Sequence, residues 1–443
     1  MGVEKVKNFL YSLGSFSSAL FSNAISTFAI FYYVDVLKAP PHLISIIMVL
    51  YGIWNAINDP LFGYLSDTTK TRWGRRKPYI VWFSLPLTIS FAMFWAPPFD
   101  SSQKTALVIY YLIMIFLFDT FFTIVFLNWT ALFPEMYPTL KERAKISGLR
   151  QILAIPGLLL GVAVTPVIAA KIGWGKMGAV FAVIGGSILY MTLFGIKENP
   201  EFSHQQTLNI IEAIKFTFFN RSFFTYVVPS FLLQFTYTML TATLPFYAKY
   251  VLKASETQTT LLLASIFVVA FFLIPVWQKI TAKIGAKKTM KVSMILWAIL
   301  LIGFGFVKTF FQAIILTSAL AMSLAGALIV FDIMIADISD EDEIKTGKRR
   351  EGMYFGANAL IIRLGISLNS LIMGFVLSSS GYDANLPAEM QPLTAVSGFR
   401  ILCSVVPIIA TIGGLLILKY YPLEGDYLNR IKEKIKNMRG EEV

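Results

Sequence analysis

Long apolar segments recur along nearly the whole chain, and short polar or Pro- and Gly-rich stretches separate them. An apolar run of about 20 residues crosses a hydrocarbon layer about 30 Å thick when it forms a helix. The runs are continuous rather than alternating, which favours helices over the strands of a membrane barrel. The pattern therefore predicts an all-α membrane protein. The twelve predicted spans are 10–34, 43–65, 79–97, 105–133, 147–170, 177–196, 222–248, 258–280, 291–307, 311–336, 353–379 and 396–420.

The spans divide into two halves of six that resemble each other. Gly74 and Gly285 stand in corresponding basic loops and are 211 residues apart, and Arg150 and Arg363 are 213 residues apart. Six-plus-six repeats with a binding site between them are typical of alternating-access transporters. The predicted organisation is a first bundle over 1–200, a cytoplasmic linker with an amphipathic helix over 201–221, a second bundle over 222–421 and a cytoplasmic tail over 422–443.

The charge pattern indicates how the chain is oriented. Only 14% of the 443 residues are charged, whereas soluble domains carry about a quarter. Lys and Arg number 38 against 26 acidic residues, and basic residues collect in two predicted loops, at 70–77 and 279–291. The positive-inside rule places these loops and both termini in the cytoplasm, with the chain in the cell membrane. It also explains the net charge of +12 without nucleic-acid binding.

Residue counts exclude several kinds of chemistry. Cys403 is the single cysteine, so no intramolecular disulfide can form. With only His42 and His204, neither a His/Cys metal site nor a Ser-His-Asp triad is supported. The chain lacks a GxxxxGK[ST] phosphate loop, so ATP-driven transport has no support. We therefore expect neither enzyme activity nor a cofactor.

Two predicted spans carry oxygen-bearing side chains at helical spacing. Asn55, Asn58 and Asp59 stand at i, i+3 and i+4, and Asp119 and Thr123 stand at i and i+4. A charge within hydrocarbon costs about 2.5 kcal/mol or more, so a carboxylate there indicates a function. This oxygen set suits a small hard cation such as Na⁺ or Li⁺, and an unpaired buried carboxylate can instead carry H⁺. Alternatively, Asp59 only holds the basic loop that follows its span.

Two arginines within predicted spans are candidates for the substrate cavity. Arg363, near the middle of its span, needs a carboxylate partner such as Asp59, Asp119 or Asp332. It replaces the cation in the empty carrier, binds a hydroxyl or anionic group of the substrate, or forms a fixed ion pair. Arg150 is a gate or helix-end contact, or a substrate ligand. The other cavity candidates can equally be packing residues, and the rings of three of them suit stacking on a sugar face. These three are Tyr32, Trp54 and Trp129, and the others are Phe126, Gln234 and Thr238.

Charged residues at the predicted inner ends of the spans are assigned to gating. Acidic and basic groups alternate there in a way that favours salt bridges that open and close with the carrier. In the second half, an acidic cluster over 337–343 precedes a basic run over 348–350. The predicted gating residues are Asp67, Arg72, Arg75, Arg76, Glu135, Arg143, Asp337 and Arg350.

Several segments are similar to a known family. The segments 58–67 (NDPLFGYLSD) and 72–78 (RWGRRKP) resemble the signature of the glycoside–pentoside–hexuronide:cation symporters, the melibiose permease-like family of the major facilitator superfamily. Segments 32–36 (YYVDV), 131–135 (ALFPE) and 421–423 (YPL) add to the resemblance. It implies a twelve-helix carrier in which Na⁺, Li⁺ or H⁺ drives solute uptake. It also assigns Asn58, Asp59 and Thr123 to the cation site.

The chain departs from the melibiose permeases at their sugar-binding positions. Ala19 and Phe126 stand at the positions of their two sugar-binding aspartates. Asn55 stands where they have the first aspartate of the second span, and Arg363 stands where they have a lysine in the eleventh span. The pattern Phe118-Asp119-Thr120 is similar instead to one in the sodium-dependent lysophosphatidylcholine symporters. We expect a cation-coupled glycoside or sugar symporter, with an amphiphile symporter as the alternative and a non-transporting sensor as a remote one. The expected partners are a small solute, a monovalent cation and the lipid bilayer, and the carrier is expected to be monomeric.

Overall fold

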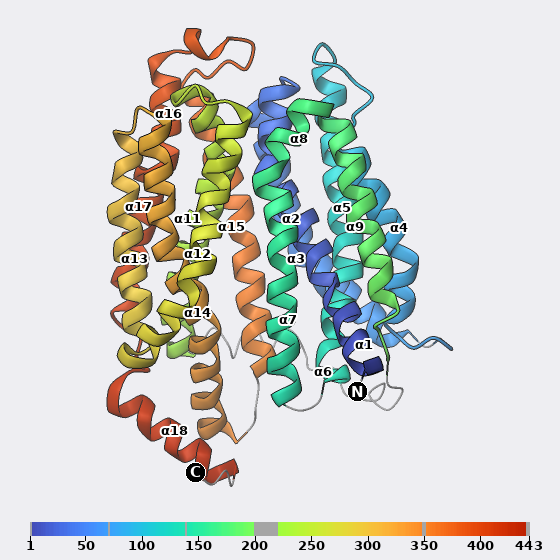
Figure 1. The fold of residues 1–443 in the computed structure, drawn as a ribbon, viewed down its shortest axis with the longest axis vertical. Coiled ribbons are helices and arrows are strands. Elements are labelled where there is room, and N and C mark those ends of the chain that lie inside the picture. Colours follow the sequence, from blue (N-terminus) through green and yellow to red (C-terminus); the bar gives the residue numbers. More distant parts are fainter. Residues whose placement is uncertain (1, 70, 138–139, 199–219, 348–350, 440–443) are drawn as a thin grey trace. The chain divides into compact units, whose positions relative to one another are not determined.

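A computed structural model describes residues 2–69, 71–137, 140–198, 220–347 and 351–439. Every regular element within these ranges is a helix, which confirms the predicted all-α class (Figure 1). Ten helical stretches of the described chain are long and apolar enough to cross a membrane. The two other predicted spans, 79–97 and 353–379, fall on the helices α4 (Lys77–Phe94) and α15 (Glu351–Ser379). The predicted linker lies almost wholly outside the described residues, so its amphipathic helix stays a prediction.

The chain divides into two compact units. The first comprises Met1–Thr207, Ser255–Ala264 and Ser370–Met390, and the second comprises Leu208–Ala254, Ser265–Asn369 and Gln391–Val443. The first unit therefore takes up short segments from the second predicted bundle.

The helices of the chain have the following bounds. From the N-terminus they are α1 (Gly2–Ser12), α2 (Gly14–Ile30), η1 (Phe31–Val36), α3 (Pro41–Thr68), α4 (Lys77–Phe94), α5 (Lys104–Ala131), α6 (Phe133–Met136), α7 (Leu140–Leu158), η2 (Leu159–Val164), α8 (Thr165–Ile172) and α9 (Trp174–Leu193). Then follow α11 (Arg221–Phe246), η4 (Tyr247–Val251), α12 (Glu256–Ile284), α13 (Ala286–Ile302), η5 (Gly303–Gly305), α14 (Phe310–Thr346), α15 (Glu351–Ser379), η6 (Ala388–Met390), α16 (Leu393–Cys403), α17 (Val405–Leu418) and α18 (Gly425–Arg439).

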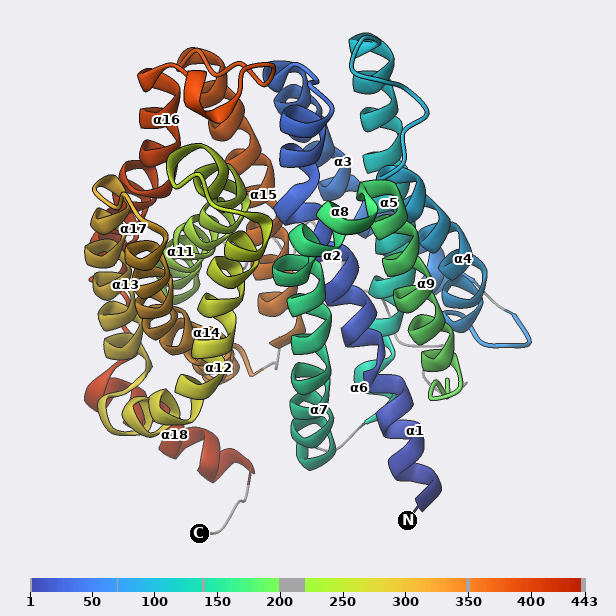
Figure 2. The same cartoon turned by 45° about the horizontal axis from the view of Figure 1, so that its top comes forward.

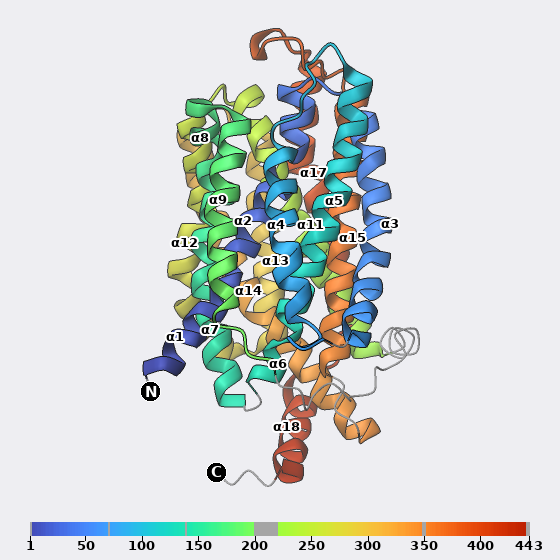
Figure 3. The same cartoon turned by 90° about the vertical axis from the view of Figure 1, so that its right-hand side faces the viewer.

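Small residues set the helix packing of the first unit. A Cβ at Gly157 would collide with the backbone oxygen of Phe16, and one at Gly161 would collide with that of Leu20. α7 and η2 therefore approach α2 closely, as glycines four residues apart allow in membrane helices. On another side of the unit, α4 packs beside both α5 and α9 (Figure 3). This packing leaves α2, α5 and α7 to surround the pocket described below.

The first helix of each predicted half ends in the same way. η1 and η4 are π-helical turns, and the lysine two residues after each turn has a left-handed backbone, with φ of 63° at Lys38 and 52° at Lys253. The sequence Val-Leu-Lys-Ala occurs at both places, at 36–39 and 251–254. This similarity adds to the repeat inferred from Gly74 and Gly285.

The second unit packs α11 against α17 and α13 against both α14 and α17 (Figure 2). Cys403, at the end of α16, has no exposed surface. α18 packs on the end of α14, where Ile431 and Ile435 are buried and Lys432 pairs with Asp337 at 3.4 Å. The tail after the last span is thus anchored on its own unit.

Candidate functional site

The five predicted cation ligands lie together, where α3 and α5 pack against each other. On α3 the helical spacing turns Asn55, Asn58 and Asp59 towards α5. On α5, Thr123 is buried and donates a hydrogen bond from Oγ1 to Oδ1 of Asp59 over 3.1 Å. The sequence therefore predicted which residues meet, although the pairing of the two helices becomes visible only in the fold.

Asp119 accepts hydrogen bonds from three neutral side chains. Asn55 Nδ2 lies 2.8 Å from Oδ1, Asn58 Nδ2 lies 2.9 Å from Oδ2, and Tyr51 Oη lies 3.1 Å from Oδ1. Sequence reasoning missed Tyr51, although it stands one helical turn before Asn55 and so continues the polar stripe of α3. These donors orient the carboxylate without neutralising its charge.

The cluster contains more acceptor oxygen than its donors satisfy. Asn58 has no exposed surface, and its Oδ1 atom is buried without a hydrogen-bond partner. A buried polar atom without a partner is rare, because it loses its hydration and gains nothing in return. A small cation would satisfy this oxygen together with the neighbouring carboxylate and hydroxyl groups. Among the described residues, no group of three or more His, Cys, Asp and Glu side chains could hold a metal ion.

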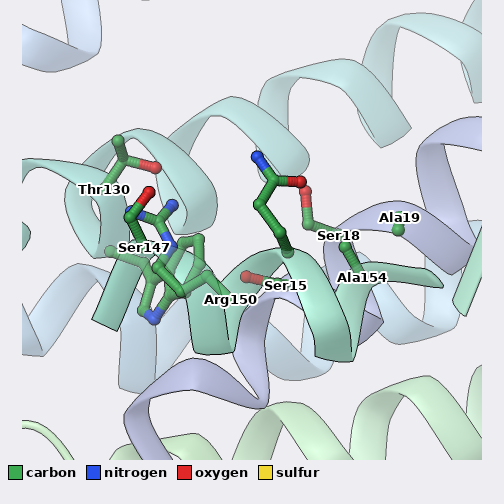
Figure 4. Close-up of a pocket in the computed structure, with 9 residues that line it drawn as sticks. Ser15, Ser18, Ala19, Thr130, Ser147, Arg150 and Ala154 are labelled. Carbon is green, nitrogen blue, oxygen red and sulfur yellow. The ribbon is translucent and has the colours of Figure 1, made fainter. Parts of the chain in front are cut away.

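A pocket with a cavity of about 340 Å³ lies in the same unit. Figure 4 shows Thr130, Ser147 and Arg150 together on one side of it, and Ser18, Ala19 and Ala154 on the other. Its lining comes from α2, α5 and α7, and α7 contributes residues at i, i+3, i+4 and i+7. The lining residues are Ser15, Ser18, Ala19, Trp129, Thr130, Ser147, Arg150, Gln151 and Ala154.

Arg150 and Trp129, two predicted cavity residues, stack on each other in this pocket. The guanidinium carbon of Arg150 lies 4.2 Å from the ring centroid of Trp129 and 5.0 Å from that of Phe133. On the indole, Tyr11 also stacks, with 5.2 Å between ring centroids. Trp129 is almost fully buried and donates from Nε1 to the backbone oxygen of Tyr11 over 3.1 Å.

Three aromatic cavity candidates lie elsewhere in the first unit. Trp54 donates from Nε1 to Thr120 over 3.1 Å, and Phe126 is buried between Phe122 and Trp129. Tyr32 is buried and donates its hydroxyl to the backbone oxygen of Trp95 over 2.8 Å. None of these three side chains lines the pocket of Arg150.

The remaining cavity candidates belong to the second unit. Gln234 donates from Nε2 to Ser230 over 3.1 Å, and Thr238 hydrogen-bonds to backbone oxygens of its own helix, α11. Both contacts stay within α11, which is how many polar side chains in membrane helices are satisfied. Arg363 lies on α15, but its side chain is outside the described part, so its role stays a prediction.

The basic loop before α4 is held by two carboxylates. Glu135 Oε1 lies 2.6 Å from both Arg75 and Arg76. Glu198 accepts hydrogen bonds from the backbone N–H groups of Arg75, Arg76 and Lys77, over 2.8 to 3.2 Å. A carboxylate at these N–H groups also stabilises the N-terminus of α4. Sequence reasoning missed Glu198, since contacts to backbone N–H groups leave no residue pattern.

The structure describes only some of the other predicted gating residues. Arg72 is exposed and lies over the ring of its neighbour Trp73, at 5.5 Å. Asp337 is buried in the second unit and pairs with Lys432. The side chains of Asp67 and Arg143, and the whole of Arg350, lie outside the described part of the chain.

The chain also matches a known protein family. The model described as "MFS/sugar transport protein" matches residues 10–425. The chain belongs to this family. This confirms the resemblance inferred from the segments at 58–67 and 72–78, and it makes the chain a multi-pass membrane transporter rather than an enzyme.

Known proteins and a solved structure resemble the chain over almost its full length. The isoprimeverose transporter of Lactiplantibacillus pentosus is 24% identical, over 97% of this chain and 91% of the relative. Sodium-dependent lysophosphatidylcholine symporter 1 of Gallus gallus is 23% identical, over 97% and 89%. The crystal structure of the nucleoside transporter NupG has a TM-score of 0.68 at 13% identity, over 94% and 99% of the two chains. The last likeness shows the fold alone.

Proposed function

We propose that this chain is a cation-coupled symporter that imports a small organic solute, a glycoside or other sugar, by alternating access. The coupling ion is Na⁺, Li⁺ or H⁺. The site of action is the cell membrane, with both termini in the cytoplasm, in line with the basic loops at 70–77 and 279–291. The observation that carries the proposal is the buried oxygen cluster between α3 and α5, with its unpartnered Asn58 oxygen.

Cation binding removes an energetic penalty in this cluster. Asp119 is buried, and its described donors are neutral, so the ionised carboxylate keeps its charge in a poorly solvated place. A cation held by Asp59, Asn58 and Thr123 would compensate this charge. In the occluded states of the cycle, the cluster with a bound cation then has a lower free energy than the empty cluster. This difference couples the movement of the ion to that of the solute.

α5 connects the cation cluster to the pocket. Asp119 and Thr123 contribute to the cluster, and Trp129, less than two helical turns after Thr123, lines the pocket. Between them Phe122, Phe126 and Trp129 form a row of ring contacts, with centroid distances of 4.6 Å and 6.1 Å. A shift of α5 on cation binding would therefore reach the pocket directly.

A second candidate is a symporter for a lysolipid or another amphiphile. Ala19 lines the pocket at a position where melibiose permeases are expected to hold a sugar-binding aspartate. Phe126 fills the other such position with a buried aromatic ring. A relative of similar coverage is named as a lysophosphatidylcholine symporter, which supports keeping this alternative.

The test is cation dependence in the purified carrier. In proteoliposomes, an inward Na⁺, Li⁺ or H⁺ gradient should drive solute uptake, and Asp59→Asn should abolish the gradient-driven part. Na⁺ or Li⁺, but not K⁺ or choline, should raise the unfolding temperature of the wild type and not of Asp59→Asn. A matched control is Asp100→Asn, since Asp100 is an exposed carboxylate that contacts only its own loop among the bonds described. Gradient-driven uptake by Asp59→Asn would refute the proposal.

A further inference from the structure

Arg150 is a membrane-embedded cation for which the described chain supplies no anion. No described residue accepts a hydrogen bond from its guanidinium or forms an ion pair with it, and its contacts are the ring faces of Trp129 and Phe133. A guanidinium has five N–H donors in a planar fork. Ring faces attract the positive charge but accept none of these N–H groups. The donors are therefore free for a ligand.

The rest of the pocket lining supports the same conclusion. Ser15, Ser18, Thr130 and Ser147 offer hydroxyl groups and Gln151 offers an amide, whereas no lining residue has a carboxylate. The hydroxyl and amide groups can both donate and accept hydrogen bonds, so the only full charge that the lining presents is that of the Arg150 guanidinium, which matches an acceptor-rich anionic ligand group.

Stacking against a sugar ring is also unavailable in this pocket. The face of Trp129 carries the guanidinium of Arg150, the indole also stacks with Tyr11, and only 2% of the residue is exposed. The aromatic ring that sequence reasoning offered as a sugar platform instead serves to fix the arginine. The pocket is thus organised around a held positive charge.

We infer that this pocket binds an anionic group of the transported solute, a carboxylate, sulfonate or phosphate, with Arg150 as its counterion. The inference rests on the proposed function and narrows its substrate class to solutes that bear an anionic group. Such a group satisfies the planar N–H fork of Arg150 bidentately, and the hydroxyls of Ser15, Ser18 and Ser147 take up its remaining lone pairs. An acidic glycoside and a lysophospholipid headgroup share this chemistry.

The charge balance of transport follows from this assignment. A solute with one negative charge that enters with one Na⁺ moves no net charge across the membrane. Uptake of such a solute at this stoichiometry is then insensitive to membrane voltage, whereas uptake of a neutral solute with one Na⁺ is driven by a negative interior.

The experiment compares matched pairs of ligands on the carrier in lipid nanodiscs with Na⁺ present. One pair is a methyl glucuronide and the corresponding methyl glucoside, and the other is lysophosphatidylcholine below its micellar concentration and a monoacylglycerol. The anionic or phosphate-bearing member of one pair should bind roughly tenfold to a hundredfold more tightly than its partner. Arg150→Gln should reduce that ratio to about one, and Arg150→Lys should restore part of it. The pair that responds identifies the source of the anion.

Controls separate this inference from the proposed function. Lys145→Gln removes an exposed positive charge from the same helix outside the pocket and should leave the ratio unchanged. Arg150→Gln should keep the stabilisation by Na⁺, which shows that it folds with an intact cation cluster. A Na⁺ response combined with equal binding of both members of each pair, with no binding of any member, or with a preference that survives Arg150→Gln would overturn the inference. Absence of gradient-driven uptake by the wild type with Na⁺, Li⁺ and H⁺ alike would instead refute the coupling proposal.

Discussion

Asn58 donates a hydrogen bond to Asp119 over 2.9 Å while its own side-chain oxygen, equally buried, has no partner. The same amide thus orients one carboxylate and presents an acceptor to a guest cation. Asn58→Ala should lower cation affinity roughly tenfold or more, since it removes one ligand and one orienting bond. Titration of the unfolding temperature with Na⁺ or Li⁺ measures the effect.

Asn128→Ala is the matched control for this prediction. Asn128 is also a fully buried asparagine with an unpartnered oxygen, but its Nδ2 donates to Ile124 in its own helix. Its replacement should destabilise the protein and leave the Na⁺ response in place. An unchanged Na⁺ affinity in Asn58→Ala would remove Asn58 from the cation site.

Tyr51→Phe tests the donor that sequence reasoning missed. The tyrosine hydroxyl donates to Asp119 over 3.1 Å, and hydrogen bonds to charged groups contribute about 1.5–3 kcal/mol. The variant should unfold at a lower temperature without cation. It should also gain more from saturating Na⁺ than the wild type, because its carboxylate is less well satisfied. Thermal unfolding with and without Na⁺ measures this difference. A smaller rise of the unfolding temperature in Tyr51→Phe than in the wild type would contradict the role of Tyr51 in the cation site.

Gly74→Ala should weaken the basic loop before α4. Gly74 has a φ of +102°, and a Cβ there would collide with the carboxylate of Glu198, which holds the N–H groups that follow. The repeat-related Gly285 has a φ of +84° and open space around its Cβ position. Gly285→Ala therefore reports backbone strain alone, about 1–3 kcal/mol. Thermal unfolding should show a larger loss for Gly74→Ala, and equal losses would exclude a role for the Glu198 contact.

Ala19→Asp should abolish the anion preference of the pocket. The new carboxylate would lie in the same pocket as Arg150 and offer it an internal partner. The ratio of glucuronide to glucoside affinity should fall towards one or below, as in Arg150→Gln, while Na⁺ still stabilises the protein. Ala19→Ser adds a polar group without charge and should keep the ratio. Retention of the preference in Ala19→Asp would count against Arg150 as the counterion.

The anchoring of α18 on α14 should weaken at high pH. Tyr427 donates its hydroxyl to Glu341 over 2.7 Å, and this bond to a carboxylate raises the pKa of Tyr427 from 10.0 to about 12. The folded state therefore holds this proton more firmly than the unfolded state does. The stabilisation is present in full below about pH 10 and is lost as the pH rises through about 12. Proteolysis of the tail between pH 9 and pH 12 should show this loss, and Tyr427→Phe should lack that pH dependence.

The sequence predicted those parts of the site whose signal is local. Helical spacing put Asn55, Asn58 and Asp59 on one face, and the apolar runs placed the spans. What it could not reach depends on contacts between distant segments. Trp129 was offered as a platform for a sugar, but the fold pairs its ring with Arg150 and Tyr11.

Glu198 and Tyr32 illustrate the same limit from two sides. Glu198 acts on backbone N–H groups that every residue possesses, so no sequence pattern announces the contact. Tyr32 carries an aromatic ring and a hydroxyl that suit a cavity, yet the fold packs the ring against Trp95 and Trp174 and gives the hydroxyl to a backbone oxygen. The residue type indicates which contacts a side chain can make, and its neighbours in the fold determine which of them it does make.

The burial of Cys403 has a practical consequence. Since the only thiol of the chain has no exposed surface, maleimide reagents should leave the native protein unlabelled while its fold is intact. Any cysteine introduced at an exposed position then becomes the single attachment point for a fluorophore or spin label. The wild-type chain is in this sense already a background for spectroscopic distance measurements that follow the transport cycle in real time.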